Sequence, residues 1–168
     1  MNHLHEIIAE LQKQSVDFII CGGVAALLHG VDRVTVDIDI AVDLDWHSTE
    51  HLLLAMENLK LVPRVPLPAA TLLDRDKIDQ IVREKNALVF TFIDLSNPYR
   101  QVDVFLTDQM SYKNLLPHSE LIAFQNGQLR VLTKQKLIEL KEKIQPTRDK
   151  DQYDIAQLRK IANEETKR

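Results

Sequence analysis

Cysteine and glycine are scarce in this sequence, and long apolar runs are absent. The single cysteine, Cys21, excludes an internal disulfide and fits a reducing compartment, so we expect a cytoplasmic protein. No apolar run approaches the roughly 20 residues that a membrane helix needs, so we expect no membrane partner. The first residues show neither the basic segment nor the apolar segment of a secretory signal. With 168 residues, the chain is long enough to form one globular domain with a substantial core.

The net charge of −4 argues against a generic nucleic-acid-binding protein. The charge is unevenly spread, because residues 134–168 hold ten Lys/Arg and seven Asp/Glu. Their balance is +3, and the first 133 residues carry −7. A basic tail of this kind can neutralise a triphosphate or contact RNA, but the solvated faces of helices carry the same charges. Charge alone leaves both interpretations open.

Two of the four glycines are adjacent, at the point where an apolar strand gives way to a helix. Gly22 and Gly23 follow the apolar segment 18–21 and precede a predicted helix over residues 23–29. Without Cβ atoms, this backbone can approach phosphate oxygens, and the N–H groups that open the helix point at an anion. Such a turn alone is more often only a tight connection between elements.

Bulky apolar residues occupy every second position from 34 to 42, which predicts a strand with one buried face. The face that we expect in the core carries Val34, Val36, Ile38, Ile40 and Val42. The opposite face carries Thr35, Asp37, Asp39 and Ala41. The two carboxylates therefore point the same way, and like charges this close raise each other's pKa unless a cation lies between them. Hard oxygen ligands suit Mg²⁺ or Mn²⁺.

A Gly-Gly turn followed by an Asp-x-Asp strand resembles the signature of the nucleotidyltransferase superfamily, with its polymerase-beta-like fold. The resemblance requires a third carboxylate on a neighbouring strand, and Asp103, within the short apolar run 101–106, supplies it. The chain is also similar to AbiEii/AbiGii-type and minimal nucleotidyltransferases of toxin–antitoxin and phage-defence systems. Their C-terminal elements correspond to Leu-Ile-x-x-Lys at 137–141 and to the charged helix start at 148–154. The resemblance covers residues 18–158.

This resemblance implies a role for each site residue. Asp37, Asp39 and Asp103 would hold Mg²⁺ (or Mn²⁺), and Asp103 could accept the proton of the attacking hydroxyl. The residues expected to bind the nucleoside triphosphate (NTP) are Gly22, Gly23, Arg33, Thr35, Lys141 and Lys150. Because Lys134, Lys136 and Lys143 lie near Lys141 in the sequence, the lysine that reaches the phosphates stays open.

The pattern of elements predicts an α/β fold, with a small mixed sheet packed by helices. We expect a nucleotidyltransferase core over residues 1–132, which includes a β-hairpin around Asn126-Gly127, and a helical appendage over residues 133–168. The expected helices are 3–14, 23–29, 48–58 (capped by Ser48 or Asp45), 74–85, 134–144 and 149–163. The expected strands are 17–21, 34–42, 87–95, 101–106, 121–124 and 129–132. Three prolines at 63, 66 and 68 predict a surface excursion that borders the active site.

Several other patterns support only structural interpretations. His47 and His51 have the spacing of a zinc pair, but no further ligand completes a set, which favours solvated helix residues. Asp43 and Asp45 continue the phase of the Asp-x-Asp pair, and a loop or a helix cap is the expected role. Cys21 is expected to pack as a small apolar side chain.

The leading functional hypothesis is a Mg²⁺-dependent nucleotidyltransferase that moves a nucleoside monophosphate from an NTP to a hydroxyl of tRNA or of a partner protein, as a component of a toxin–antitoxin or phage-defence system. One alternative is a catalytically idle domain that binds a nucleotide or a partner, including an antitoxin. The complete set of carboxylates argues against it, because an idle fold has no reason to keep that electrostatic cost. A second alternative is an antibiotic nucleotidyltransferase. The sequence does not separate these acceptors, because loops build acceptor pockets.

Overall fold

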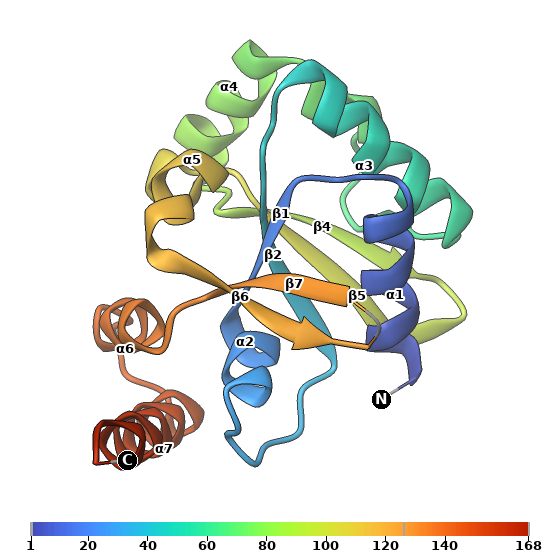
Figure 1. The fold of residues 1–168 in the computed structure, drawn as a ribbon. Helices are drawn as coiled ribbons and strands as arrows, with labels where there is room; N and C mark the ends of the chain where they lie inside the picture. The colour runs from blue at the N-terminus through green and yellow to red at the C-terminus, as the bar shows by residue number, and fades with distance from the viewer. Residues whose placement is uncertain (1, 126, 168) are drawn as a thin grey trace.

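The computed structural model describes residues 2–125 and 127–167. Within them, seven strands form one mixed sheet in the order β3-β4-β5-β2-β1-β7-β6 (Figure 1). The strands are β1 (Phe18–Cys21), β2 (Asp37–Val42), β3 (Val62–Pro63), β4 (Val89–Asp94), β5 (Asn97–Phe105), β6 (Ser119–Phe124) and β7 (Gly127–Leu132). This confirms the predicted α/β class. Over the same residues, none of the helices has the length and apolar character that crossing a bilayer requires.

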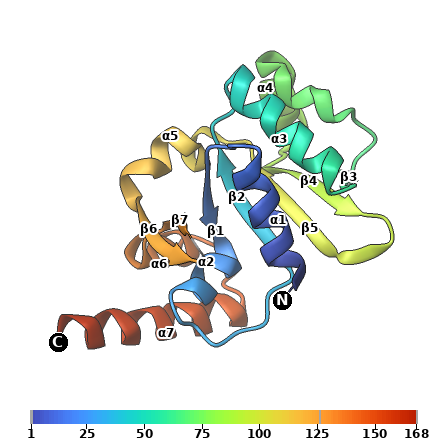
Figure 2. The same cartoon turned by 45° about the vertical axis from the view of Figure 1, so that its right-hand side comes forward.

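The helices group on different parts of the sheet. They are α1 (Asn2–Lys13), α2 (Gly22–Leu28), α3 (Trp46–Asn58), α4 (Arg75–Lys85), α5 (Tyr112–Leu115), α6 (Lys134–Glu142) and α7 (Asp149–Thr166). Three 3₁₀ turns cover Ala69–Leu73, Asp108–Met110 and Leu116–His118. In both views, α1 and α3 lie on one side of the molecule, whereas α6 and α7 lie together near α2 (Figures 1 and 2).

The alternation in β2 builds the core as predicted from Asp37 onward. Ile38, Ile40 and Val42 are all buried, and they pack with buried side chains of β1, β4 and β5. The helix after β2 begins where the cap was expected, because the Asp45 carboxylate accepts a hydrogen bond from the Ser48 N–H at 2.7 Å.

The prediction of a strand over 34–42 is wrong for its first three residues. Val34 is 89% exposed and Val36 is 37% exposed, and β2 begins only at Asp37. The pairing of β2 with β5 starts at Asp37 and its pairing with β1 covers 39–42, so residues 34–36 have no neighbouring strand. Alternation without a partner strand does not make a strand. These residues instead form a loop that carries Arg33 and Thr35 towards the start of α2.

The sheet is larger at its edges than the sequence indicated. Residues 62–63 of the proline-containing segment form β3, which pairs with β4. Strand β5 begins at Asn97, so the connection predicted around Asn97-Pro98 lies two residues earlier, at Leu95-Ser96. The hairpin of β6 and β7 is confirmed, with Phe124 opposite Gly127. Asn126, predicted in its turn, lies outside the described residues.

Candidate active site

The strand register collects polar side chains on one face of the sheet. Asp39 lies opposite Cys21 of β1 and Asp103 of β5, and Asp103 lies opposite Thr91 of β4. Asp37 lies opposite Gln101 in the same way. Because residues two apart on a strand share a face, both rows project their side chains to the same side.

Asp37, Asp39 and Asp103 form a compact acidic cluster. Carboxylate oxygens of the three lie within 4.8 Å of one another, so the three predicted carboxylates do come together. Burial, followed by the charges of Asp37 and Asp103, raises the pKa of Asp39 to about 6, although a hydrogen bond from the Gly23 backbone opposes this rise. The cluster forms no ion pair with any described residue.

The donor set of this cluster fits a hard divalent cation. It offers only carboxylate oxygens, and their mutual repulsion would be relieved by a positive ion between them. Mg²⁺ and Mn²⁺ both match these ligands. Among the described residues no second group of three or more candidate ligands occurs, so His47 and His51 belong to no such set.

The two glycines allow close approaches within the chain itself. Gly22 has φ +57°, and a Cβ there would lie 1.9 Å from Oδ2 of Asp39. A Cβ on Gly23 would lie 2.7 Å from Oγ1 of Thr35 and 3.1 Å from the Arg33 guanidinium. From the sequence, we expected the missing Cβ atoms of the two glycines to make room for phosphate oxygens. The structure shows that the glycines first make room for Asp39 and for the loop before β2.

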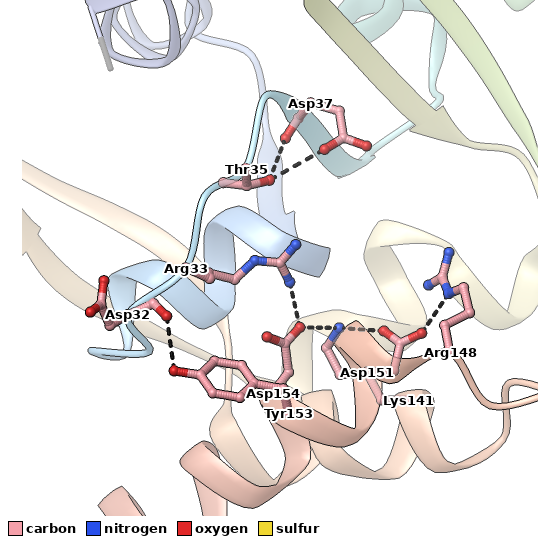
Figure 3. Close-up of polar contacts among 9 residues, drawn as sticks. All are labelled: Asp32, Arg33, Thr35, Asp37, Lys141, Arg148, Asp151, Tyr153 and Asp154. Atoms are coloured by element: carbon pink, nitrogen blue, oxygen red, sulfur yellow. Dashed lines mark hydrogen bonds and ion pairs between the residues drawn. The ribbon is translucent and has the colours of Figure 1, made fainter.

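An ion network links the C-terminal helices to that loop (Figure 3). Lys141 Nζ lies 2.9 Å from Oδ1 of Asp151 and 2.7 Å from Oδ2 of Asp154. Asp154 also pairs with Arg33, and Asp151 accepts a hydrogen bond from Nε of Arg148 at 2.5 Å. Three cations surround two carboxylates, so the network keeps one positive charge in excess beside the acidic cluster.

Burial of the two aspartates makes this network costly to disturb. The side chains of Asp151 and Asp154 are each 1% exposed, and Lys141 is buried too. Burial by itself raises the pKa of Asp151, but hydrogen bonds from Arg148 and Lys141 outweigh it and hold that pKa below its usual range. Nearby, the Tyr153 hydroxyl donates to the Asp32 carbonyl at 3.1 Å, which fixes α7 against the same loop (Figure 3).

Asp154→Asn is expected to lower the free energy of unfolding by about 2–3 kcal/mol, because Arg33 loses its carboxylate and Lys141 keeps only Asp151. Urea unfolding followed by circular dichroism measures this change. Asp149→Asn, at an exposed position at the start of the same helix, is the matched control and should change stability by less than about 1 kcal/mol. Equal stability of the Asp154 variant and the unsubstituted protein would contradict the importance of the network.

A cavity of about 500 Å³ lies beside the acidic cluster. Gly22, Asp39, Lys141 and Arg148 line it. Its apolar lining comes from the residue before β4, the end of β5, the following 3₁₀ turn, α6 and the segment after α6: Leu88, Phe105, Met110, Leu137, Leu140 and Ile144. The cavity therefore offers charged groups and an apolar surface to one ligand.

Most of the predicted site residues converge around this cavity and the cluster, but Lys150 does not. Lys150 is exposed and absent from the lining, whereas Lys143 and Arg148 take part in it. Sequence reasoning also missed Thr91 and Gln101, which bond to Asp103. Gln101 gave a signal in the sequence, because it is polar and precedes Asp103 by two residues on β5. Thr91 is on β4 and lies opposite Asp103 only through the strand register.

Comparisons with known proteins give matches of structure and not of sequence. No protein-family model and no curated protein sequence matches the chain. The fold is similar to that of the lincosamide antibiotic adenylyltransferase LnuA in its lincomycin-bound crystal structure. The TM-score is 0.64, with 15% identity, over 95% of this chain and 96% of that chain. It is also similar to the solution structure of the antibiotic-resistance factor ANT(2'')-Ia, with a TM-score of 0.56 and 15% identity, over 97% of this chain and 82% of that chain. The chain therefore has a nucleotidyltransferase-like fold, as the Gly-Gly turn and the three carboxylates predicted.

Proposed function

We propose that the protein is a Mg²⁺-dependent nucleotidyltransferase, which transfers a nucleoside monophosphate from an NTP to a hydroxyl group. The observation that carries the proposal is the cluster of Asp37, Asp39 and Asp103 beside a cavity that Gly22 and Lys141 help to line. Such a transfer requires the triphosphate to be held, its charge to be neutralised and the acceptor oxygen to be aligned.

Each requirement has a group in this chain. The three carboxylates would hold Mg²⁺ or Mn²⁺. When bound, the cation neutralises negative charge on the triphosphate and on the reacting oxygens. Lys141 and Arg148 line the cavity and would bind phosphate oxygens, with Arg33 close to Gly23. Asp103 does not line the cavity. In this proposal the acceptor hydroxyl binds beside Asp103, which would accept its proton.

The apolar part of the cavity would take the nucleoside. Phe105 lies two residues beyond Asp103 on β5, a spacing of about 6.6–6.8 Å along the strand. The base would then contact Phe105 and Leu88 while the phosphates remain beside Gly22 and Asp39. A volume of about 500 Å³ is within the range of sites for ligands of this size.

For the acceptor, a small hydroxyl-bearing molecule is a second candidate beside the tRNA or partner protein that the AbiEii resemblance implies. Six of the ten basic residues after position 133 form ion pairs, which weakens the charge argument for RNA. They are Lys134, Lys136, Lys141, Lys143, Arg148 and Arg159. Two solved structures of similar fold are an antibiotic adenylyltransferase and an antibiotic-resistance factor, which favours a small acceptor.

The proposal predicts transfer of label from an α-³²P NTP to an acceptor in the presence of Mg²⁺, with none in EDTA. The assay takes each NTP in turn with total tRNA, a lysate, or a panel of aminoglycosides and lincosamides. Label on tRNA or on a protein supports the toxin-type acceptor, and label on an antibiotic supports the small acceptor. NTP binding without transfer to any of them would favour the idle domain.

A further inference from the structure

Asp103 is held more firmly than Asp37, its neighbour in the cluster. The Thr91 hydroxyl donates to its Oδ1 at 2.6 Å, and the Gln101 side-chain amide donates to its Oδ2 at 3.0 Å. Asp37, by comparison, accepts one side-chain hydrogen bond, from Thr35 at 3.2 Å. Both oxygens of Asp103 are therefore fixed in direction by side chains of β4 and β5.

The strand register explains why these two donors reach Asp103. Thr91 lies directly opposite it in the antiparallel pair of β4 and β5, where Cβ atoms are about 4.5–5.5 Å apart. Gln101 precedes it by two residues and shares its face. Phe90 and Phe92 are buried on the opposite face, which turns Thr91 towards the cluster.

Arg64, the residue after strand β3, supports the same pair from the outside. The Arg64 backbone N–H donates to the Thr91 carbonyl at 2.9 Å, and the Arg64 guanidinium lies 3.4 Å from Oε1 of Gln101. That contact occupies the amide oxygen of Gln101 and orients its NH₂ towards Asp103. The proline-containing segment thus contacts both partners of Asp103 through Arg64.

We infer that Thr91 and Gln101 are positioning residues, which fix the Asp103 carboxylate for a divalent cation. The inference rests on the proposed function. Each carboxylate oxygen has two acceptor sites, so an oxygen that accepts one hydrogen bond keeps a lone pair for a metal ion. A metal-binding carboxylate that is itself hydrogen-bonded loses little freedom on binding, and removing such a partner typically lowers metal affinity 10–100-fold.

The test is titration of the full chain with Mn²⁺, with and without a non-hydrolysable NTP analogue. Calorimetry and the electron paramagnetic resonance signal of free Mn²⁺ both measure the Mn²⁺ affinity. Thr91→Val, which keeps the shape and removes the hydroxyl, is expected to weaken Mn²⁺ binding about tenfold or more. Thr91→Ser restores the donor and should bind as the unsubstituted protein does. Gln101→Met is expected to weaken binding similarly, and it serves if Thr91→Val fails to fold.

Thr49→Val is the matched control. The Thr49 hydroxyl is buried in α3 and has no hydrogen-bond partner among the described residues, so its removal should leave Mn²⁺ affinity unchanged. Unchanged affinity in both Thr91→Val and Gln101→Met, with normal binding by the unsubstituted chain, would overturn the inference and leave the proposed function standing. Absence of Mn²⁺ binding by the unsubstituted chain, with and without the analogue, would overturn the proposed function itself.

Discussion

Asp39→Asn is expected to abolish nucleotide transfer and, without divalent cations, to stabilise the folded protein. The substituted side chain lacks the negative charge that a cation requires, and several kcal/mol of transition-state stabilisation correspond to a rate lower by about 10³-fold or more. Its amide oxygen can still accept the hydrogen bond from the Gly23 backbone. A loss of activity together with a gain in stability would show that the Asp39 carboxylate serves the site at a cost to folding stability.

The stabilisation has a defined pH dependence. Burial and two neighbouring carboxylates raise the pKa of Asp39 from 3.8 to about 6, so the folded state binds its proton more tightly than the unfolded state. The cost of ionising Asp39 is absent below about pH 4, grows as the pH rises, and reaches on the order of 2–3 kcal/mol above about pH 6. Asparagine does not titrate and escapes this cost.

Urea unfolding in EDTA from pH 4 to pH 8, with label transfer in Mg²⁺, measures both effects. Asp43→Asn is the control, because Asp43 follows β2 in the same phase and lies outside the cluster. Its stability should not diverge from that of the unsubstituted protein as the pH rises. A variant of Asp39 that transfers nucleotide at the normal rate would remove Asp39 from the proposed site.

Gly22→Ala is expected to lower the free energy of unfolding by about 3–4 kcal/mol. The residue has φ +57°, which costs a side-chain-bearing residue about 1–2 kcal/mol, and the new Cβ would lie 1.9 Å from Oδ2 of Asp39. Either the turn or Asp39 must move, so nucleotide transfer should be lost as well.

Two other glycines separate these causes. Gly30 has φ +96° but only Ile161 Cδ1, at 3.8 Å, near the position of a Cβ, so Gly30→Ala measures backbone strain alone, about 1–2 kcal/mol. Gly127 has no described atom within 4 Å of that position, and Gly127→Ala should be within about 0.5 kcal/mol of the unsubstituted protein. Chemical denaturation of the three variants provides the measurement. If Gly22→Ala costs no more than Gly30→Ala, the contact with Asp39 has no energetic weight.

The sequence was sufficient to predict the acidic cluster because its geometry is local in each strand. Alternation places Asp37 and Asp39 on one face, and an apolar run marks the strand of Asp103. The same alternation failed at Val34 and Val36, since no neighbouring strand extends that far. Alternation indicates which side chains share a face, but it does not indicate where the neighbouring strand ends.

The ion network could not be predicted from local sequence patterns. Arg33 and Asp154 are 121 residues apart in the sequence, and only the packing of α7 against the loop before β2 brings them together. A charged helix start is compatible with a solvated surface as well as with a buried network, so Asp151 and Asp154 gave no distinct signal. Gln101 could have been found, because it precedes Asp103 by two residues on the same strand. Thr91 could not, because its place opposite Asp103 depends on a strand register that the sequence does not state.

The ion network also bears on when the site can exist during protein synthesis. The acidic cluster and the glycine turn are encoded before residue 104, whereas Lys141, Arg148 and Asp154 emerge from the ribosome much later. A nascent chain without them can pair most of the sheet but leaves Arg33 without its carboxylate and the cavity without its cationic side. Under the proposed function, a premature stop upstream of α6 is therefore expected to yield a product that transfers no nucleotide, because its cavity lacks Lys141 and Arg148.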